Sequence, residues 1–520
     1  MENEKSFSEI FEGLKDQLRY FSKERIFKVS LDLLRKQWGK SVKDIALSQG
    51  QFQNPWFIFL IMKWGLIYGT DHRVASRSFG ENEFSHLYNQ LIDLPANSNL
   101  GAGAKNSELG LWKFIRCVMH GQIHYQYQLS YYGAAVLKTI KDRVGINYDV
   151  DAQLENISGL RFNDFLEIQV FTCAAMQGNP QLLDYEADSF KGAYSKYTKE
   201  KILKLLNFSS LNFHELTDFF KQDHDWVANP EYEYGLITPL IRKPLFRDYA
   251  KFTPFHPIHL QYYINFGAYD NLRESDKSRF PQQFGVALED YVKTPLSNAT
   301  KEMLRESDLK PIIGQSSVVD YALPSKNSCV LLEVKTAEMY PLTFHDPQVD
   351  YFRRTFNSSI IKAYVQIFSA AQKLKQTPQY SSITEWFGVI VMYKEQFLGT
   401  PATVWEEFVK DSLLGIPDLP FDVLSPPIPP ENVITTCVAD LDLVCEYCRK
   451  HGIEIGSALA TVVENNKDKG HQSLFLRDHF KDEDFTWMSI SHVYQSFTEI
   501  MDSIRDGFQM TQGGNTQNRI

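Results

Sequence analysis

Two charged side chains lie close together in an otherwise apolar segment of this 520-residue chain. Residues 328–339 read SCVLLEVKTAEM, and their branched apolar side chains predict a buried β-strand. Glu333 and Lys335 are two positions apart, so on a strand they point to the same face as Leu331. Burying an unpaired charge is costly, so these two side chains must line a wetted cleft or have partners.

A carboxylate in the preceding segment offers such a partner. Asp320 lies in SSVVDYALP, a short strand candidate, and the LPSKNS that follows contains good turn residues. If the two strands form a hairpin, Asp320 lies beside Glu333. The opposite face of the second strand, at alternate positions from Val330 to Thr336, is mostly apolar and suits cover by a helix.

Two carboxylates and a lysine in one cleft suit the hydrolysis of phosphodiester bonds. Carboxylate oxygens bind Mg²⁺, which keeps several waters and also takes a substrate phosphate oxygen, and we expect Mn²⁺ to substitute for it. The metal polarises the phosphoryl oxygen and lowers the pKa of a bound water. Lys335 can stabilise charge on the phosphorus, or orient or deprotonate the attacking water. The peptide carbonyl of Val334 offers a further ligand.

The arrangement of Asp320, 12 intervening residues and Glu333-Val334-Lys335 resembles the PD-(D/E)xK nuclease superfamily, which has the restriction-endonuclease-like fold. The resemblance implies that Asp320 and Glu333 are metal ligands and that Lys335 is the catalytic lysine. The sequence departs from the family pattern at Val319, where a proline usually precedes the first aspartate.

The segments on either side strengthen the resemblance. The family has a helix before its first core strand, often with a glutamate that joins the metal site, and FGVALEDYV resembles it with Glu289 as the match. A helix after the E-x-K strand often presents a glutamine or a basic residue, and KAYVQIFSAAQKL resembles it with Gln366 as the match. We expect LKPIIGQ to be a strand and EWFGVIVMYK to be the last one. Residues 279–394 then give the order αβββαβ.

The whole chain is predicted to be an α+β multidomain protein in three parts. Apolar spacing near 3.6 predicts a large, mainly helical N-terminal recognition or partner domain at 1–270. The restriction-endonuclease-like α/β nuclease domain is expected at 275–424. A stiff Pro-rich linker, 424–432, then leads to a helical, acidic C-terminal region at 433–520.

Composition predicts a cytoplasmic protein. The most apolar window, residues 55–69, is interrupted by Lys63 and is shorter than the roughly 18–20 residues of a membrane span, so we expect a buried helix there. Cysteine content is low, and the N-terminus lacks a basic start followed by an apolar run. The net charge is -10, and residues 401–520, with 9 Lys/Arg and 19 Asp/Glu, hold the whole excess. That region is therefore not expected to track a phosphate backbone.

Other residues that could bind metal are less well arranged. One CxxC lies inside what reads as a continuous amphipathic helix with no second pair nearby, so we expect small apolar core cysteines rather than a zinc site. Two histidine pairs are isolated in the sequence. The residues concerned are Cys437, Cys445, Cys448 and His451, and the pairs His120/His124 and His256/His259.

The sequence thus predicts a Mg²⁺-dependent endonuclease that hydrolyses DNA. A nuclease fold embedded in helical domains resembles the effectors of bacterial restriction and antiphage defence. One alternative is an inactive nuclease-like scaffold that binds DNA or a partner subunit, and another is an enzyme that cuts RNA. A protein partner subunit is expected to bind through the helical N-terminal or the acidic C-terminal region. The chain can also form an oligomer, and no membrane is expected.

Overall fold

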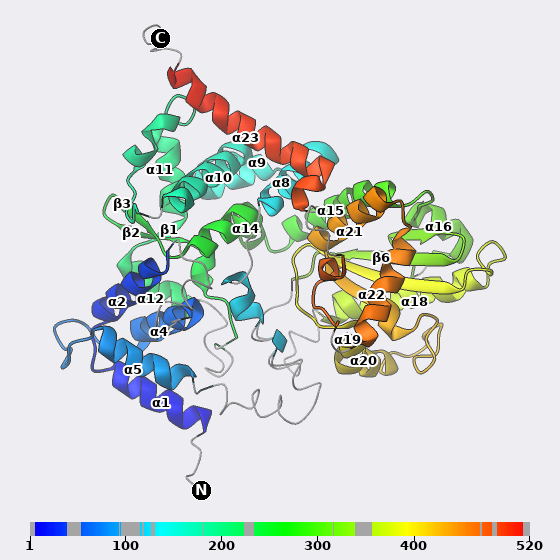
Figure 1. Cartoon of the computed structure of the whole chain (residues 1–520), viewed down its shortest axis with the longest axis horizontal. Coiled ribbons are helices and arrows are strands. Elements are labelled where there is room, and N and C mark those ends of the chain that lie inside the picture. The colour runs from blue at the N-terminus through cyan, green and yellow to red at the C-terminus, as the bar shows by residue number, and fades with distance from the viewer. Residues whose placement is uncertain are drawn as a thin grey trace. The chain divides into compact units, whose positions relative to one another are not determined.

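The computed structural model forms two compact units (Figure 1). The first comprises residues 1–135, 149–275 and 497–520, and the second comprises 136–148 and 276–496. The structure describes residues 6–38, 54–92, 94, 115–116, 119–125, 131–179, 181–222, 233, 235–315, 317–338, 356–468, 471–480 and 486–512, without the side chains of 507–512. The predicted α+β class is confirmed.

The first unit is mainly helical, as predicted for residues 1–270, and contains one small sheet. Strands β1 (Ser210–Leu211) and β2 (Leu245–Asp248) are parallel, and β3 (Lys251–Pro254) is antiparallel to β2. Its helices are α1 (Phe7–Leu18), α2 (Lys23–Lys36), α4 (Pro55–Tyr68), α5 (Glu81–Ile92), α9 (Val150–Ser158), α10 (Phe162–Gly178), α11 (Lys199–Phe208), α12 (Phe213–Gln222) and α14 (Pro257–Ser275). The unit boundaries fall within or next to α8 (Tyr132–Thr139) and α23 (Ser491–Gln512).

The apolar window at 55–69 forms α4, a buried helix as predicted. Pro55 occupies its first turn, where the missing N–H costs no hydrogen bond, and the side chains from Phe57 to Leu66 are buried. Lys63, the charge inside this window, lies 3.6 Å from the carboxylate of Glu233. Among the described residues, no helix combines the length and the apolar character needed to cross a membrane.

The second unit is built on a five-stranded mixed sheet in the order β4-β5-β6-β7-β8. The first three strands are antiparallel neighbours, and β6, β7 and β8 are parallel. The strands are β4 (Leu304–Arg305), β5 (Tyr321–Pro324), β6 (Ser328–Lys335), β7 (Glu385–Met392) and β8 (Val433–Cys437). The helices are α15 (Arg279–Ala299), α16 (Glu306–Ile313), α18 (Lys362–Lys375), α19 (Pro401–Val404), α20 (Lys410–Leu414), α21 (Val438–His451) and α22 (Ile455–Lys467).

Helices cover both faces of this sheet (Figure 1). Paired residues of neighbouring strands share a face, so Leu331 and Gly388 lie on one face. That face packs against Ile367 of α18. Val330 lies on the opposite face, against α22, and α15 and α21 pack against each other beside it. The predicted division of β6 into two faces is confirmed. Helices cover both faces, and the charged residues lie at the carboxyl end of this central strand.

Two predicted elements differ from the structure. The segment LKPIIGQ, predicted as a strand, forms the end of helix α16. The Asp308 carboxylate accepts the Arg305 N–H in a capping box that starts this helix, and Leu309 and Ile313 bury one helical face, whereas Pro311 could not complete a strand ladder. The second difference is a strand, β8, at the start of the region 433–520, which was predicted to be helical.

This C-terminal region was predicted to be helical and separate, but its first residues form strand β8. Val433 pairs with Gly388 and Cys437 pairs with Met392, so the Pro-rich stretch before it joins two parts of one sheet. The β-branched run in Val433–Cys437 favours a strand. Helices α21, α22 and part of α23 follow, as the prediction expected for the rest.

Gly388 allows α18 to lie close to the sheet. A Cβ atom at this position would lie 2.8 Å from Cγ2 of Ile367 and 3.2 Å from Cγ1 of Val433. Gly388→Ala is expected to lower the free energy of unfolding by about 1–3 kcal/mol through overpacking, as measured by urea denaturation. The control is Gly13→Ala on α1, where no atom lies within 4 Å and the change should stabilise by roughly 0.5–1 kcal/mol. Equal stability of Gly388→Ala and the native chain would contradict this packing.

Candidate active site

The hairpin of β5 and β6 places Asp320 beside Glu333, as predicted. Tyr321 pairs with Leu332, so Asp320, one residue before β5, lies opposite Glu333. The Asp320 N–H donates to Glu333 Oε2 over 3.3 Å. The Val334 N–H donates to Asp320 Oδ2 over 2.7 Å. These two hydrogen bonds hold the carboxylates together at the end of the sheet where β6 leaves it.

Lys335 and Gln366 complete this group. The Lys335 ammonium lies 2.5 Å from Glu333 Oε1 and donates to Gln366 Oε1 over 3.3 Å. The Gln366 amide in turn donates to the carbonyl of Val318 over 3.0 Å. Gln366 therefore faces the charged group from α18, and it links Lys335 to the segment that carries Asp320.

Burial distinguishes the members of the group. The Glu333 side chain is 2% exposed, whereas the Lys335 side chain is 15% exposed. Solvent or a substrate can therefore reach the ammonium more easily than the carboxylate. Glu333 lies at the floor of the site, and Lys335 at its rim.

Glu289 lies on α15 near this site, but its carboxylate does not form a close group of three ligands with those of Asp320 and Glu333. Its backbone carbonyl accepts the Tyr321 hydroxyl over 2.7 Å, which ties α15 to the start of β5. The pKa of the Glu289 carboxyl is raised to about 7, first by burial and then by the negative charge of Asp320. The structure thus brings Glu289 within electrostatic reach of Asp320, although it forms no side-chain hydrogen bond to Asp320 or Glu333.

The electrostatics of the site favour a cation. Burial and the charge of Asp320 raise the pKa of Glu333 to about 7, against the opposing effect of Lys335. Burial also raises the pKa of Asp320, while the Val334 N–H and Lys335 act in the opposite direction. Three partly desolvated carboxyls thus share the site with one ammonium in contact. A bound cation would stabilise their ionised forms.

Two residues of the site were not predicted from the sequence. Glu306 is the first residue of α16, and its N–H donates to the Asp320 carbonyl over 3.1 Å. Its charge raises the pKa of both Glu289 and Asp320. Lys362 lies one turn before Gln366 on α18, and its charge opposes the rise at Asp320. Glu306 and Asp308 in the first turn of α16 are the sequence signal that could have identified Glu306. It was missed because the segment that starts at Leu309 was predicted to be a strand.

The donor set fits Mg²⁺ or Mn²⁺. Carboxylate oxygens of Asp320 and Glu333, with Glu289 nearby, are the hard ligands that these ions prefer, and they leave positions for water and phosphate. The N–H of Val334 is engaged by Asp320, and its carbonyl as a further ligand remains a prediction.

The cysteines and histidines considered in the sequence were not expected to form zinc sites. Cys445 and Cys448 are buried in α21, and Cys437 is buried at its start, as expected for core cysteines. In the first unit, His259 is buried and its Nε2 lies 2.8 Å from the Tyr125 hydroxyl. Within the described part of the chain, no group of three metal-ligand side chains includes a histidine.

Glu333 should make stability depend on pH. Its folded-state pKa of about 7 lies above the ordinary value of 4.5, so its contribution to stability is complete below about pH 4.5 and is lost as pH rises through 7. Glu333→Gln does not titrate and is expected to gain about 1–3 kcal/mol over the native chain between pH 5 and pH 8. Urea denaturation in EDTA measures this, with Glu385→Gln at the exposed start of β7 as control. A constant difference across this range would contradict the assignment.

No protein-family model matches the chain, and no curated protein or solved structure matches it either.

Proposed function

We propose that this protein is a metal-dependent nuclease and that DNA is its substrate. The observation that carries the proposal is the convergence of Asp320, Glu333, Lys335 and Gln366 within hydrogen-bonding contact at one edge of a sheet. These residues come from three separate elements, β6, α18 and the segment before β5. A solvated surface ion pair would need neither the buried Glu333 nor the link through Gln366.

In this proposal, Asp320 and Glu333 hold a Mg²⁺ ion, with Glu289 assisting directly or through water. The ion supplies polarisation of the phosphoryl oxygen and a more acidic bound water. Lys335, at the rim, stabilises the negative charge that develops on the phosphoryl group or moves a proton from the attacking water. Gln366 positions the Lys335 ammonium by accepting its hydrogen bond, and the Val318 carbonyl fixes the Gln366 amide.

The test is digestion of supercoiled plasmid by the full chain with Mg²⁺, with Mn²⁺ and with EDTA, beside a structured RNA of similar length. We expect cleavage of DNA in either metal, none in EDTA, and none by Glu333→Ala. Cleavage of RNA alone would replace DNA as the substrate and keep the catalytic assignment. Absence of cleavage of both would support the inactive scaffold, and cleavage that persists in Glu333→Ala would show that the activity does not depend on this site. Either result would overturn the proposal.

A role in bacterial restriction or antiphage defence is proposed on architecture alone. The proposed nuclease site lies in one unit, and the other unit is mainly helical. In this proposal the helical unit recognises a trigger or a partner. Loss of phage resistance in cells that carry Glu333→Ala, compared with cells that carry the native chain, would support this role.

A further inference from the structure

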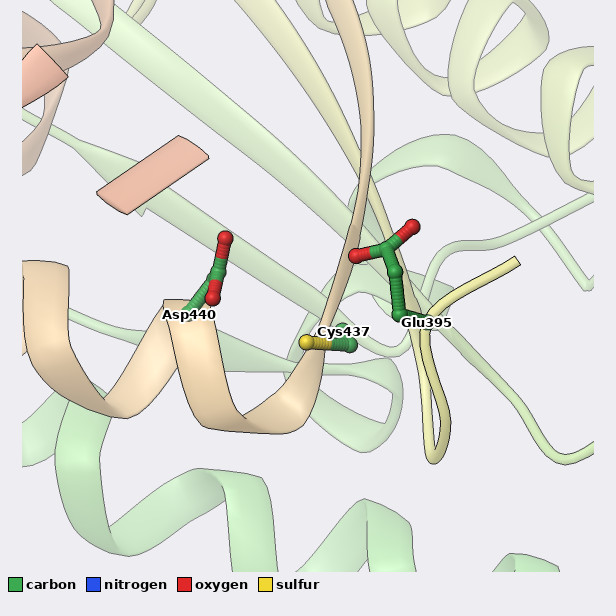
Figure 2. A group of neighbouring side chains, drawn as sticks. All are labelled: Glu395, Cys437 and Asp440. Atoms are coloured by element: carbon green, nitrogen blue, oxygen red, sulfur yellow. The ribbon is translucent and has the colours of Figure 1, made fainter. Parts of the chain in front are cut away.

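A second group of metal-ligand side chains lies at the carboxyl ends of β7 and β8. Glu395 follows β7 by three residues, Cys437 is the last residue of β8, and Asp440 lies in the first turn of α21. One ligand atom from each lies within 4.8 Å of the other two. Figure 2 shows the three side chains around a common space between α21 and the segment after β7. Among the residues that the structure describes, this is the one group of three such side chains.

The group is rich in negative charge, with Cys437 and Asp440 buried and Glu395 partly buried. Cys437 is 4% exposed and Asp440 is fully buried. Burial, then the charge of Asp440, raises the pKa of Glu395 to about 7. The Arg477 guanidinium lies 2.7 Å from Asp440 Oδ1 and carries a positive charge beside the two carboxyls and the thiol.

Local structure prepares these side chains to bind an ion. Glu395 Oε1 accepts the N–H groups of Gln396 and Phe397, each over 2.9 Å, which fixes the carboxylate and leaves its second oxygen available. Cys437 is the N-cap residue of the 14-residue helix α21. Burial and the charges of Asp440 and Glu395 raise the pKa of its thiol, so the thiolate would form only together with a bound metal ion. The Arg477 N–H donates to Asp440 Oδ2 over 3.2 Å and orients that carboxylate.

We propose that Glu395, Cys437 and Asp440 bind one zinc-class transition-metal ion. A thiolate is a soft ligand that selects zinc over Mg²⁺, and carboxylate oxygens of Asp and Glu also bind zinc. Ligand atoms on one tetrahedral zinc lie roughly 3.3–3.8 Å apart, so the three ligand atoms, which now lie within 4.8 Å of one another, would move closer together when the ion binds. On binding, the Cys437 S–H proton passes to solvent as the sulfur–metal bond forms. Three protein ligands leave one position for water.

The proposal is independent of the nuclease assignment. The carboxylates at Asp320 and Glu333 offer oxygen ligands alone and suit Mg²⁺, whereas the Cys437 group offers sulfur. An ion here would tie the segment after β7 to the start of α21, at the same edge of the sheet where β6 carries Lys335. Metal content can therefore be measured whether or not the protein cleaves nucleic acid.

The test measures zinc in the full chain after saturation with Zn²⁺ and removal of loosely bound ion by gel filtration. We expect about one zinc per chain, and loss of it in Cys437→Ala and Glu395→Gln. Cys445→Ala is the matched control, because this cysteine is also buried but belongs to no group of three metal-ligand side chains among the described residues, and it should retain zinc. Glu333→Gln should retain zinc too, which separates this site from the proposed nuclease site.

A second readout identifies the sulfur ligand directly. Titration with Co²⁺ should give a thiolate-to-cobalt charge-transfer band near the ultraviolet edge, absent in Cys437→Ala and present in Cys445→Ala. Zinc affinity in Glu395→Gln, which keeps the thiol, should fall by more than the roughly 10–100-fold seen for loss of an outer-shell partner. Native chain that takes up no zinc, or equal zinc in Cys437→Ala and the native chain, would overturn the proposal. Circular dichroism establishes that each variant is folded.

Discussion

Lys335→Met is expected to reduce metal-dependent cleavage of plasmid DNA by about 10²–10⁴-fold while the protein stays folded. Methionine has a similar length and no charge, so it removes the ammonium that contacts Glu333 Oε1 at 2.5 Å and the Gln366 amide oxygen at 3.3 Å. The variant keeps Asp320 and Glu333, and therefore the proposed metal ligands. The loss should consequently appear in the turnover rate and leave the concentration of Mg²⁺ needed for half-maximal activity within a small factor.

The matched control is Lys326→Met, in the turn at the other end of the same hairpin. Lys326 is exposed, and it lies outside the group of contacting side chains. Its replacement makes the same chemical change on the same two strands and is expected to leave cleavage unchanged. If Lys335→Met cleaved DNA as fast as Lys326→Met, Lys335 would be no more than the structural partner of Glu333, and the catalytic assignment would be wrong.

Local patterns were sufficient to predict the hairpin and its two flanking helices. The turn residues between β5 and β6 and the two-residue period of a strand together fix which side chains share a face, so Asp320 and Glu333 could be placed side by side. The helical spacing of its apolar residues predicted α18, and the family resemblance then singled out Gln366 on that helix. Each of these inferences spans a short stretch of chain.

The features that were missed depend on contacts between distant segments. Strand β8 pairs with β7 in parallel, and a parallel register is set by packing across some 40 intervening residues rather than by any turn. Glu306 was missed because Leu309 and Ile313 fit a short strand almost as well as one face of a helix until the capping contact with Asp308 is seen. The neighbours of Cys437 were missed for the same reason, since Glu395 is brought to it by this pairing.

Arg477→Met is expected to lower the free energy of unfolding by about 3 kcal/mol at pH 8 in EDTA. Asp440 is fully buried, and Arg477 supplies both a guanidinium contact of 2.7 Å and a backbone N–H to its carboxylate. Removing the guanidinium leaves a buried negative charge beside Glu395 and Cys437. Burial already raises the pKa of Asp440 against the effect of Arg477, so without Arg477 the carboxyl should take up a proton more readily. The destabilisation should therefore be smaller at pH 5 than at pH 8.

Two further variants test whether the loss arises from the buried charge. Asp440→Asn in the Arg477→Met background removes that charge and is expected to recover much of the lost stability and to flatten its dependence on pH. Lys467→Met on α22 breaks an ion pair with Glu464 of the same 2.7 Å length, but these side chains are 61% and 73% exposed. Its cost should stay below about 1 kcal/mol, as for other exposed pairs. If the double variant were no more stable than Arg477→Met, the lost stability would come from the packing of the Arg477 side chain over Phe475. The buried charge of Asp440 would then not be its cause.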